Sequence, residues 1–206
     1  MVELARLYEA VLNGDNKAAA AVTREALAEN VAPSKLISEY ITPAMGEVGR
    51  RFDCEEYYVP QLLLAARAMR AALELIGTPP EPVGRVVIGT VKGDLHDIGK
   101  NLVASMFQGG GFEVIDLGYD VTPERFVEAA QQKGADIVAL SALLTVTMPA
   151  MKTTIQALEA AGVRDRVKVL IGGAPVTQEY AEQIGADGYG SSAAAAVPLA
   201  RKVLGK

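Results

Sequence analysis

The sequence has no tryptophan, a single cysteine and a single histidine among its 206 residues. One cysteine cannot form a disulfide within the chain, so a disulfide-rich scaffold is excluded, and a free thiol fits the reducing cytoplasm, where we expect the protein. No run of eighteen apolar residues is present, so we predict no membrane-spanning helix and no membrane partner. The net charge of −5 comes from dispersed acids, which argues against a nucleic-acid-binding surface.

The first 76 residues have the spacing of amphipathic helices. Apolar residues recur at three- and four-residue steps between Leu4 and Leu12. Asp15 is a candidate N-cap of a second helix, Pro33 suits the first turn of a third, and a fourth runs over about 59–76. Four helices with short connections predict a small antiparallel bundle over residues 1–78.

A proline-rich stretch, GTPPEP at 77–82, then predicts a linker at 79–83 and a second domain over 84–206. In that second domain, strand-like runs alternate with helical ones, which predicts a parallel sheet with helices on both faces. The number of units favours a flavodoxin-like (Rossmann-like), doubly wound, five-stranded sheet of order 2-1-3-4-5. The strands are expected at 85–91, 112–117, 136–141, 167–171 and, more weakly, 187–189.

Four segments rich in glycine or serine follow the predicted strands. They are GDLHDIGK at 93–100, SALLT at 141–145, GGA at 172–174 and YGSS at 189–192. Ligands of such sheets bind beyond the carboxyl ends of the strands, where the strand order reverses. We therefore expect all four segments at one ligand-binding edge.

The single histidine, His96, lies in the first of these segments between Asp94 and Asp97. One interpretation is purely structural: His96 starts a helix and its ring bonds a backbone carbonyl. A Ser-His-Asp hydrolase using Ser141 is another, but Ser141 lacks the G-x-S-x-G elbow. A zinc site held by protein alone needs three or four ligands, whereas this chain offers one histidine and a distant cysteine. A phosphate cradle is disfavoured because the two acids would repel the anion.

A metal already held by a macrocycle suits the arrangement better, because it needs only one axial imidazole from the protein. The second ring nitrogen then needs an acceptor that fixes the tautomer, and Asp94 is the candidate. Ser141 is in turn a candidate to bond Asp94.

Three motifs, at matching spacings, resemble those of cobalamin-binding corrinoid proteins of methyl-transfer systems. They are D-x-H-x-x-G at 94–99, S-x-L at 141–143 and G-G at 172–173, with 41 and 28 residues between successive motifs. The segment 47–61 resembles the recognisable part of the helical cap of that family, so the resemblance extends over nearly the whole chain.

The resemblance implies cobalamin as the cofactor, bound base-off/His-on, with His96 as the lower cobalt ligand and Asp94 and Ser141 as its relay. The helical cap would cover the upper face, and glycines of the lower site would let the backbone approach the flat heterocycle of the cofactor tail. The implied cofactor-binding residues are Gly93, Asp94, Leu95, His96, Asp97, Ile98, Gly99, Ser141, Leu143, Thr145, Gly172, Gly173, Ala174, Tyr189 and Gly190. The cap candidates for the upper face are Phe52, Tyr58, Leu62 and Ala65.

The resemblance further implies a methyl carrier, a subunit that is not catalytic alone. It would shuttle a methyl group on cobalt between a substrate:corrinoid methyltransferase and a methylcorrinoid:acceptor methyltransferase that uses tetrahydrofolate or a thiol. A corrinoid reductive activator is a further expected partner. A cobalamin-dependent sensor and a cobalamin-storage module are the alternatives; the absence of tryptophan and of a cap histidine disfavours the sensor. Methanol, methylamines, aromatic methyl ethers and betaines all remain open as methyl donors.

Overall fold

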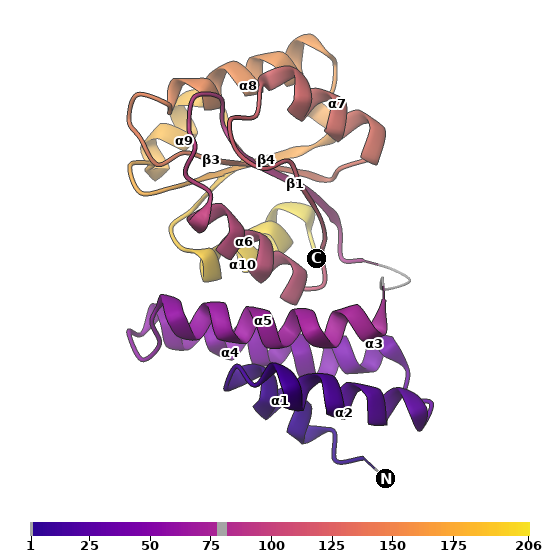
Figure 1. The fold of residues 1–206 in the computed structure, drawn as a ribbon. Helices are drawn as coiled ribbons and strands as arrows, with labels where there is room; N and C mark the ends of the chain where they lie inside the picture. Colours follow the sequence, from indigo (N-terminus) through magenta and orange to yellow (C-terminus); the bar gives the residue numbers. More distant parts are fainter. Residues whose placement is uncertain (1, 78–81) are drawn as a thin grey trace. The chain divides into compact units, whose positions relative to one another are not determined.

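The computed structural model of the chain describes residues 2–77 and 82–206. The chain divides into two compact units, one made mainly of residues 1–82 and the other mainly of residues 83–107 and 112–206. Most of the predicted linker at 79–83 lies outside the described residues. Figure 1 shows a helical first unit and a second unit in which helices flank a sheet. No helix within residues 2–77 or 82–206 is long and apolar enough to cross a membrane.

The first unit consists of four helical runs, as the apolar spacing predicts. Asp15 caps the second run by accepting hydrogen bonds from the N–H groups of Lys17 and Ala18, which confirms its predicted place. At Gly14, a Cβ would lie 2.5 Å from the Leu64 Cβ, so a glycine is required where this turn packs on the last helix. The elements are α1 (Ala5–Leu12), α2 (Asn16–Ala28), α3 (Pro33–Leu36), the π-helical η1 (Ile37–Ile41), α4 (Thr42–Asp53) and α5 (Val59–Ile76).

The third run is continuous from α3 to α4 but widens to a π-helical turn in its middle. The N–H of Thr42 bonds the carbonyl of Ile37, five residues earlier. Pro43 follows immediately and has no N–H to give to a helical ladder. The proline therefore lies in the first turn of α4, where the missing donor is tolerated, and the π turn accommodates the offset.

The second unit contains a five-stranded parallel sheet of order β2-β1-β3-β4-β5, which confirms the predicted topology. Its central strands β1, β3 and β4 are short apolar runs buried on both faces, as a parallel sheet covered by helices requires, whereas the edge strands β2 and β5 are only partly buried. The strands are β1 (Arg85–Thr90), β2 (Glu113–Asp116), β3 (Ile137–Ser141), β4 (Lys168–Gly172) and β5 (Gly188–Gly190).

Helices cover both faces of this sheet (Figure 1). On one face, α7, α8 and α9 share a buried cluster with the sheet that includes Phe126, Met151 and Val138. On the other face, α6 and α10 pack with Phe107 and Ile88. The helices are α6 (Ile98–Gly109), α7 (Pro123–Lys133), α8 (Pro149–Ala160), α9 (Gln178–Ile184) and α10 (Ala193–Leu204), with a 3-10 turn, η2 (Arg164–Arg166), before β4.

The strand register aligns the carboxyl ends of the strands. Thr90 pairs with Ser141, Ser141 with Gly172, and Gly172 with Gly190. The loops that follow β1, β3, β4 and β5 therefore start side by side at one edge, as expected for the four glycine- and serine-rich segments.

Candidate functional site

The single histidine lies in the β1–α6 loop with its side chain 49% exposed. Its Nδ1 is 2.8 Å from Oδ1 of Asp94, whose side chain is fully buried. Because an ionised carboxylate only accepts hydrogen bonds, Nδ1 carries the proton and donates it to this bond. The lone pair of the neutral ring is then on Nε2, which makes no hydrogen bond within the described part of the chain.

Asp94 is the centre of the polar contacts at this edge. Its Oδ1 also accepts the backbone N–H of His96, and its Oδ2 accepts the N–H groups of Leu143 and Leu144 and the hydroxyl of Thr147 at 2.7 Å. Burial raises the pKa of the Asp94 carboxyl, but hydrogen bonds from the Thr147 hydroxyl, the Leu143 N–H and the imidazole outweigh it. The pKa of Asp94 is therefore held well below its usual range, and the group is a carboxylate.

The hydroxyl that bonds Asp94 in this structure is that of Thr147, whereas the relay predicted from Ser141 to Asp94 stays a prediction. Ser141 ends β3, and across residues 2–77 and 82–206 its side chain has no hydrogen bond to Asp94. After Ser141 the chain turns back on itself, because the N–H of Thr147 bonds the carbonyl of Leu144, and the single hydroxyl proton of Thr147 is shared between that carbonyl and Asp94. The turn places Thr147 against Asp94, whereas Thr145 is exposed.

Exposed apolar side chains come from the same loops as the histidine and its partners. Six such residues are between 40% and 81% exposed, although all are apolar or aromatic. Five lie in the β1–α6, β2–α7 and β3–α8 connections, and Ile98 is the first residue of α6. Such a concentration marks an interaction site. The six are Leu95, Ile98, Tyr119, Leu143, Leu144 and Val146.

The glycines of the predicted site differ in whether the packing of the protein itself requires a glycine. Gly173 has a φ of +131°, and a Cβ there would lie 1.8 Å from the carbonyl oxygen of Ala142. Gly173 is therefore required by the contact between the β3–α8 and β4–α9 loops, and not only by the approach of a ligand. A Cβ at Gly190 would meet only ordinary contacts, and one at Gly99 would meet open space.

The remaining predicted residues occupy different surroundings at the same edge. Asp97 accepts a hydrogen bond from the side chain of Asn101 in the first turn of α6. Tyr189 in β5 is half-buried against the core, and Ala174 is exposed. Gly93 has a φ of +85°, which explains its glycine.

The cap candidates of the helical unit do not share one environment. Leu62 and Ala65 in α5 are buried, and Phe52 in α4 is half-buried. Tyr58, immediately before α5, is 62% exposed. Among the four, Tyr58 alone offers most of its side chain to a ligand or partner.

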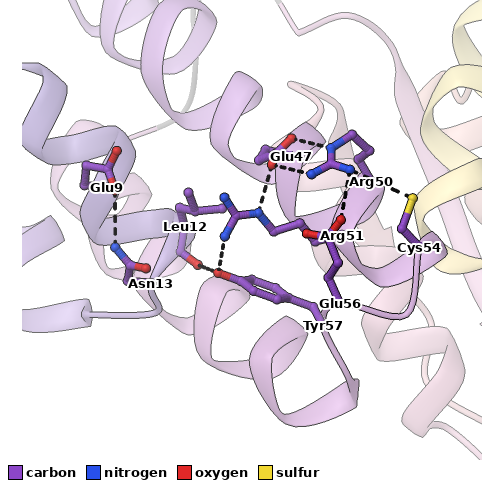
Figure 2. Close-up of polar contacts among 9 residues, drawn as sticks. All are labelled: Glu9, Leu12, Asn13, Glu47, Arg50, Arg51, Cys54, Glu56 and Tyr57. Carbon is purple, nitrogen blue, oxygen red and sulfur yellow. Dashed lines mark hydrogen bonds and ion pairs between the residues drawn. The ribbon is translucent and has the colours of Figure 1, made fainter.

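Polar contacts that the sequence patterns did not indicate fix the connection between α4 and α5 (Figure 2). Glu47 accepts hydrogen bonds from Arg50 and from Arg51, each at 2.8 Å. Arg51 also donates to the hydroxyl of Tyr57, which donates to the carbonyl oxygen of Leu12. Hydrogen bonds from the two arginines lower the pKa of Glu47 to about 2. These contacts give the segment 47–61 a structural role within the helical unit.

No group of three or more His, Cys, Asp or Glu side chains that could hold a metal ion occurs in the described ranges. One half-exposed imidazole, fixed by a buried carboxylate and bordered by exposed apolar side chains, instead fits a metal whose other positions a flat macrocycle fills. The residues present therefore fit a corrinoid, in which the corrin ring holds the cobalt.

Known proteins with similar sequences and structures support this fit. Two family models, each described as a B12 binding domain, match residues 84–197 and 3–76. Trimethylamine corrinoid protein 1 of Methanosarcina acetivorans is 44% identical over 98% of this chain and 96% of its own length.

Two solved structures are also similar over nearly the whole chain. A cobalamin-binding protein from Desulfitobacterium hafniense is 35% identical, with a TM-score of 0.82 and 98% of each chain covered. In the methanol:cobalamin methyltransferase complex of Methanosarcina barkeri, a chain that is 30% identical has a TM-score of 0.87, with 98% of this chain and 80% of that chain covered. The resemblance inferred from the three motifs is thus confirmed: the chain belongs to the B12-binding family, among the corrinoid proteins of methyltransferase systems.

Proposed function

We propose that this protein carries a methyl group on the cobalt of a bound corrinoid and that His96 is the lower axial ligand of that cobalt. The observation that carries the ligand assignment is the 2.8 Å contact between Nδ1 of His96 and the buried carboxylate of Asp94. This contact fixes the tautomer that leaves the Nε2 lone pair available. As the chain has no second histidine, no other imidazole of the protein can take this role.

The corrinoid supplies a cobalt ion that can take a methyl group from a donor and give it to an acceptor. The protein supplies orientation and proton control. Because five hydrogen bonds keep Asp94 ionised, its carboxylate would hold the proton of the His96 ring on Nδ1 and leave Nε2 free for the cobalt of the corrinoid. The bond to Asp94 would also keep the ring in the orientation that ligation needs.

The exposed apolar side chains provide the second part of the site. Leu95 and Tyr119 lie in the connections that follow β1 and β2, Ile98 begins α6, and Leu143 follows β3. A large, flat and largely apolar ring would cover such residues and remove their surface from water, which stabilises the complex in proportion to the area covered. This argument supports corrin binding on the sheet edge that carries His96.

Two kinds of methyltransferase are the proposed partners. One delivers the methyl group from a small methylated compound, of the class that includes the trimethylamine and methanol named for the relatives. The other passes it to an acceptor such as a folate or a thiol, and a reductive activator restores the corrinoid when it becomes oxidised. As a carrier, the protein catalyses neither transfer alone.

Reconstitution with cobalamin tests the ligand assignment. The wild type should show an EPR signal of the cobalt(II) form split by one nitrogen nucleus, and His96→Gly should bind cobalamin without that splitting. Added imidazole should restore the splitting in His96→Gly, because it occupies the space that the ring leaves. A His96→Gly protein with the wild-type signal would refute the ligand assignment.

The carrier role has a separate test. Methylated holoprotein should lose its methyl group to an acceptor only when an acceptor methyltransferase is added. Failure of every methyltransferase encoded beside the gene to load or unload the protein would instead favour cobalamin storage.

A further inference from the structure

The His96 loop is held by contacts that do not involve the carboxylate of Asp94. Thr90, the last residue of β1, is fully buried, and its hydroxyl donates a 3.0 Å hydrogen bond to the carbonyl oxygen of His96. Asp120, in the β2–α7 loop, accepts the N–H of Gly93 at 2.7 Å and donates its own N–H to the carbonyl of Asp94. The loop backbone is thus anchored before His96, at Gly93 and Asp94, and at the carbonyl of His96 itself.

A buried lysine ties the other end of the loop. Lys100, in the first turn of α6, has a side chain only 1% exposed, and its ammonium donates to Asp116 at the end of β2 and to Asn101. The second oxygen of Asp116 accepts the N–H of Gly118. An ammonium is buried at a substantial cost in free energy unless it is paired. This pair therefore fixes α6, four residues after His96, to the end of β2.

We propose that these residues form a loop clamp, defined as Thr90, Lys100, Asp116 and Asp120, and that Thr90 is a positioning residue for the axial ligand His96. The inference rests on the proposed function, because it concerns how firmly His96 holds cobalt. Asp94 sets the tautomer of the ring, whereas the clamp sets where the backbone of His96 lies.

The chemistry of metal ligation makes backbone position important. Metal–nitrogen bonds tolerate errors of only about 0.2 Å, so a ligand on a loop that can shift spends less time at bonding distance. Thr90 contributes to the sheet through its backbone, with its N–H bonded to the carbonyl of Gly118 and its carbonyl bonded to the N–H of Val121. Valine would preserve both bonds and fill the same buried space. Thr90→Val would therefore remove only the hydrogen bond from the hydroxyl to the His96 carbonyl.

The clamp is tested in the full-length holoprotein with the matched pair Thr90→Val and Thr154→Val. Thr154 is also fully buried, and its hydroxyl also donates to a backbone carbonyl, that of Ala150 in α8, away from the His96 loop. Each substitution removes one buried hydrogen bond and should lower the melting temperature of the apoprotein by about 3 °C. The readout is the ratio of His-on to base-off cobalt(II), measured from the nitrogen splitting of the EPR signal.

Thr90→Val should lower this ratio by about tenfold, the lower end of what partners of metal ligands contribute. Thr154→Val should leave it unchanged, and Thr90→Ser, which keeps the hydroxyl, should recover most of it. Lys100→Met, which keeps the length of the side chain, is an independent variant of the clamp and should lower the ratio in the same direction.

Two different failures can be told apart. A wild-type holoprotein without nitrogen splitting would overturn the ligand assignment and, with it, the clamp. Normal splitting in the wild type, with an unchanged ratio in both Thr90→Val and Lys100→Met, would overturn the clamp and leave the proposed function intact.

Discussion

Replacement of Asp94 by asparagine is the sharpest test of the proton arrangement at the site. The carboxylate accepts five hydrogen bonds, two on the oxygen that faces His96 and three on the oxygen that faces the β3–α8 loop. An amide of the same shape has one accepting oxygen. Since the β3–α8 loop presents three donors, we expect the oxygen of Asn to face it and the NH₂ group to face His96.

The cost in stability follows from these contacts. The backbone N–H of His96 would then face another donor, and the loss of charge weakens the three remaining bonds. A buried donor left without a partner costs about 1–3 kcal/mol, so the total loss should be about 3 kcal/mol. This corresponds to a fall of about 10 °C in the melting temperature of the apoprotein.

The same variant should change the tautomer of the imidazole. The NH₂ group of Asn would donate to Nδ1 of His96, so the ring proton moves to Nε2, and the nitrogen proposed to bind cobalt loses its lone pair. Because the chain has a single histidine, ¹⁵N NMR of labelled apoprotein assigns the tautomer without overlap. The wild type should be protonated on Nδ1 and the variant on Nε2. A variant with the wild-type tautomer and melting temperature would refute the reasoning.

The pH dependence gives a second measurement on the same pair. The pKa of Asp94 is lower in the folded protein than in the unfolded chain, so its contribution to stability is present above the ordinary pKa of 3.8. That contribution is lost as the pH falls through the folded-state value. The difference in melting temperature between the wild type and Asp94→Asn should therefore shrink steadily below about pH 4.

Three further predictions concern other parts of the structure. Thr147→Val should lower the free energy of unfolding by about 2 kcal/mol in urea titrations, because it removes the hydroxyl that bonds the buried carboxylate. Ser141→Ala should change the free energy of unfolding by less than about 0.5 kcal/mol, and equal effects of the two variants would contradict the hydrogen-bond assignment. Gly173→Ala should cost about 3 kcal/mol, since its Cβ would collide with a neighbouring carbonyl, while Gly99→Ala, in open space, should be neutral within about 0.5 kcal/mol. The pKa of Glu47 is lowered from 4.5 to about 2, so its ion pairs stabilise the fold above pH 4.5 and are lost toward pH 2, and the difference in melting temperature between the wild type and Glu47→Gln should shrink over that range.

Sequence patterns predicted the architecture because burial leaves a periodic signal. Apolar runs predicted the first four strands and, more weakly, the short β5, while the number of strand–helix units favoured the order β2-β1-β3-β4-β5. The pairing of His96 with Asp94 was also predictable, since a residue two positions earlier in a loop can reach back to the ring. These features depend on local spacing.

Features that depend on the path of a loop were not predictable in the same way. Ser141 and Thr147 both follow the apolar run of β3, and only the turn closed on the Leu144 carbonyl brings the second hydroxyl to Asp94. The link from Arg51 through Tyr57 to the end of α1 joins polar groups far apart in the sequence, which leave no periodic pattern. In both cases the missing information is the three-dimensional course of the chain between the elements.

The contact at Gly173 limits how this site could be transplanted. The N–H of Ala142 bonds the carbonyl of Gly172, and Gly173 lies where any side chain would displace Ala142. The next residues, Leu143 and Leu144, provide the backbone donors for Asp94. A chimera that receives the histidine loop alone would therefore inherit the proposed ligand, His96, without the loops that support Asp94, and a working graft must carry the loops after β3 and β4 as a matched pair.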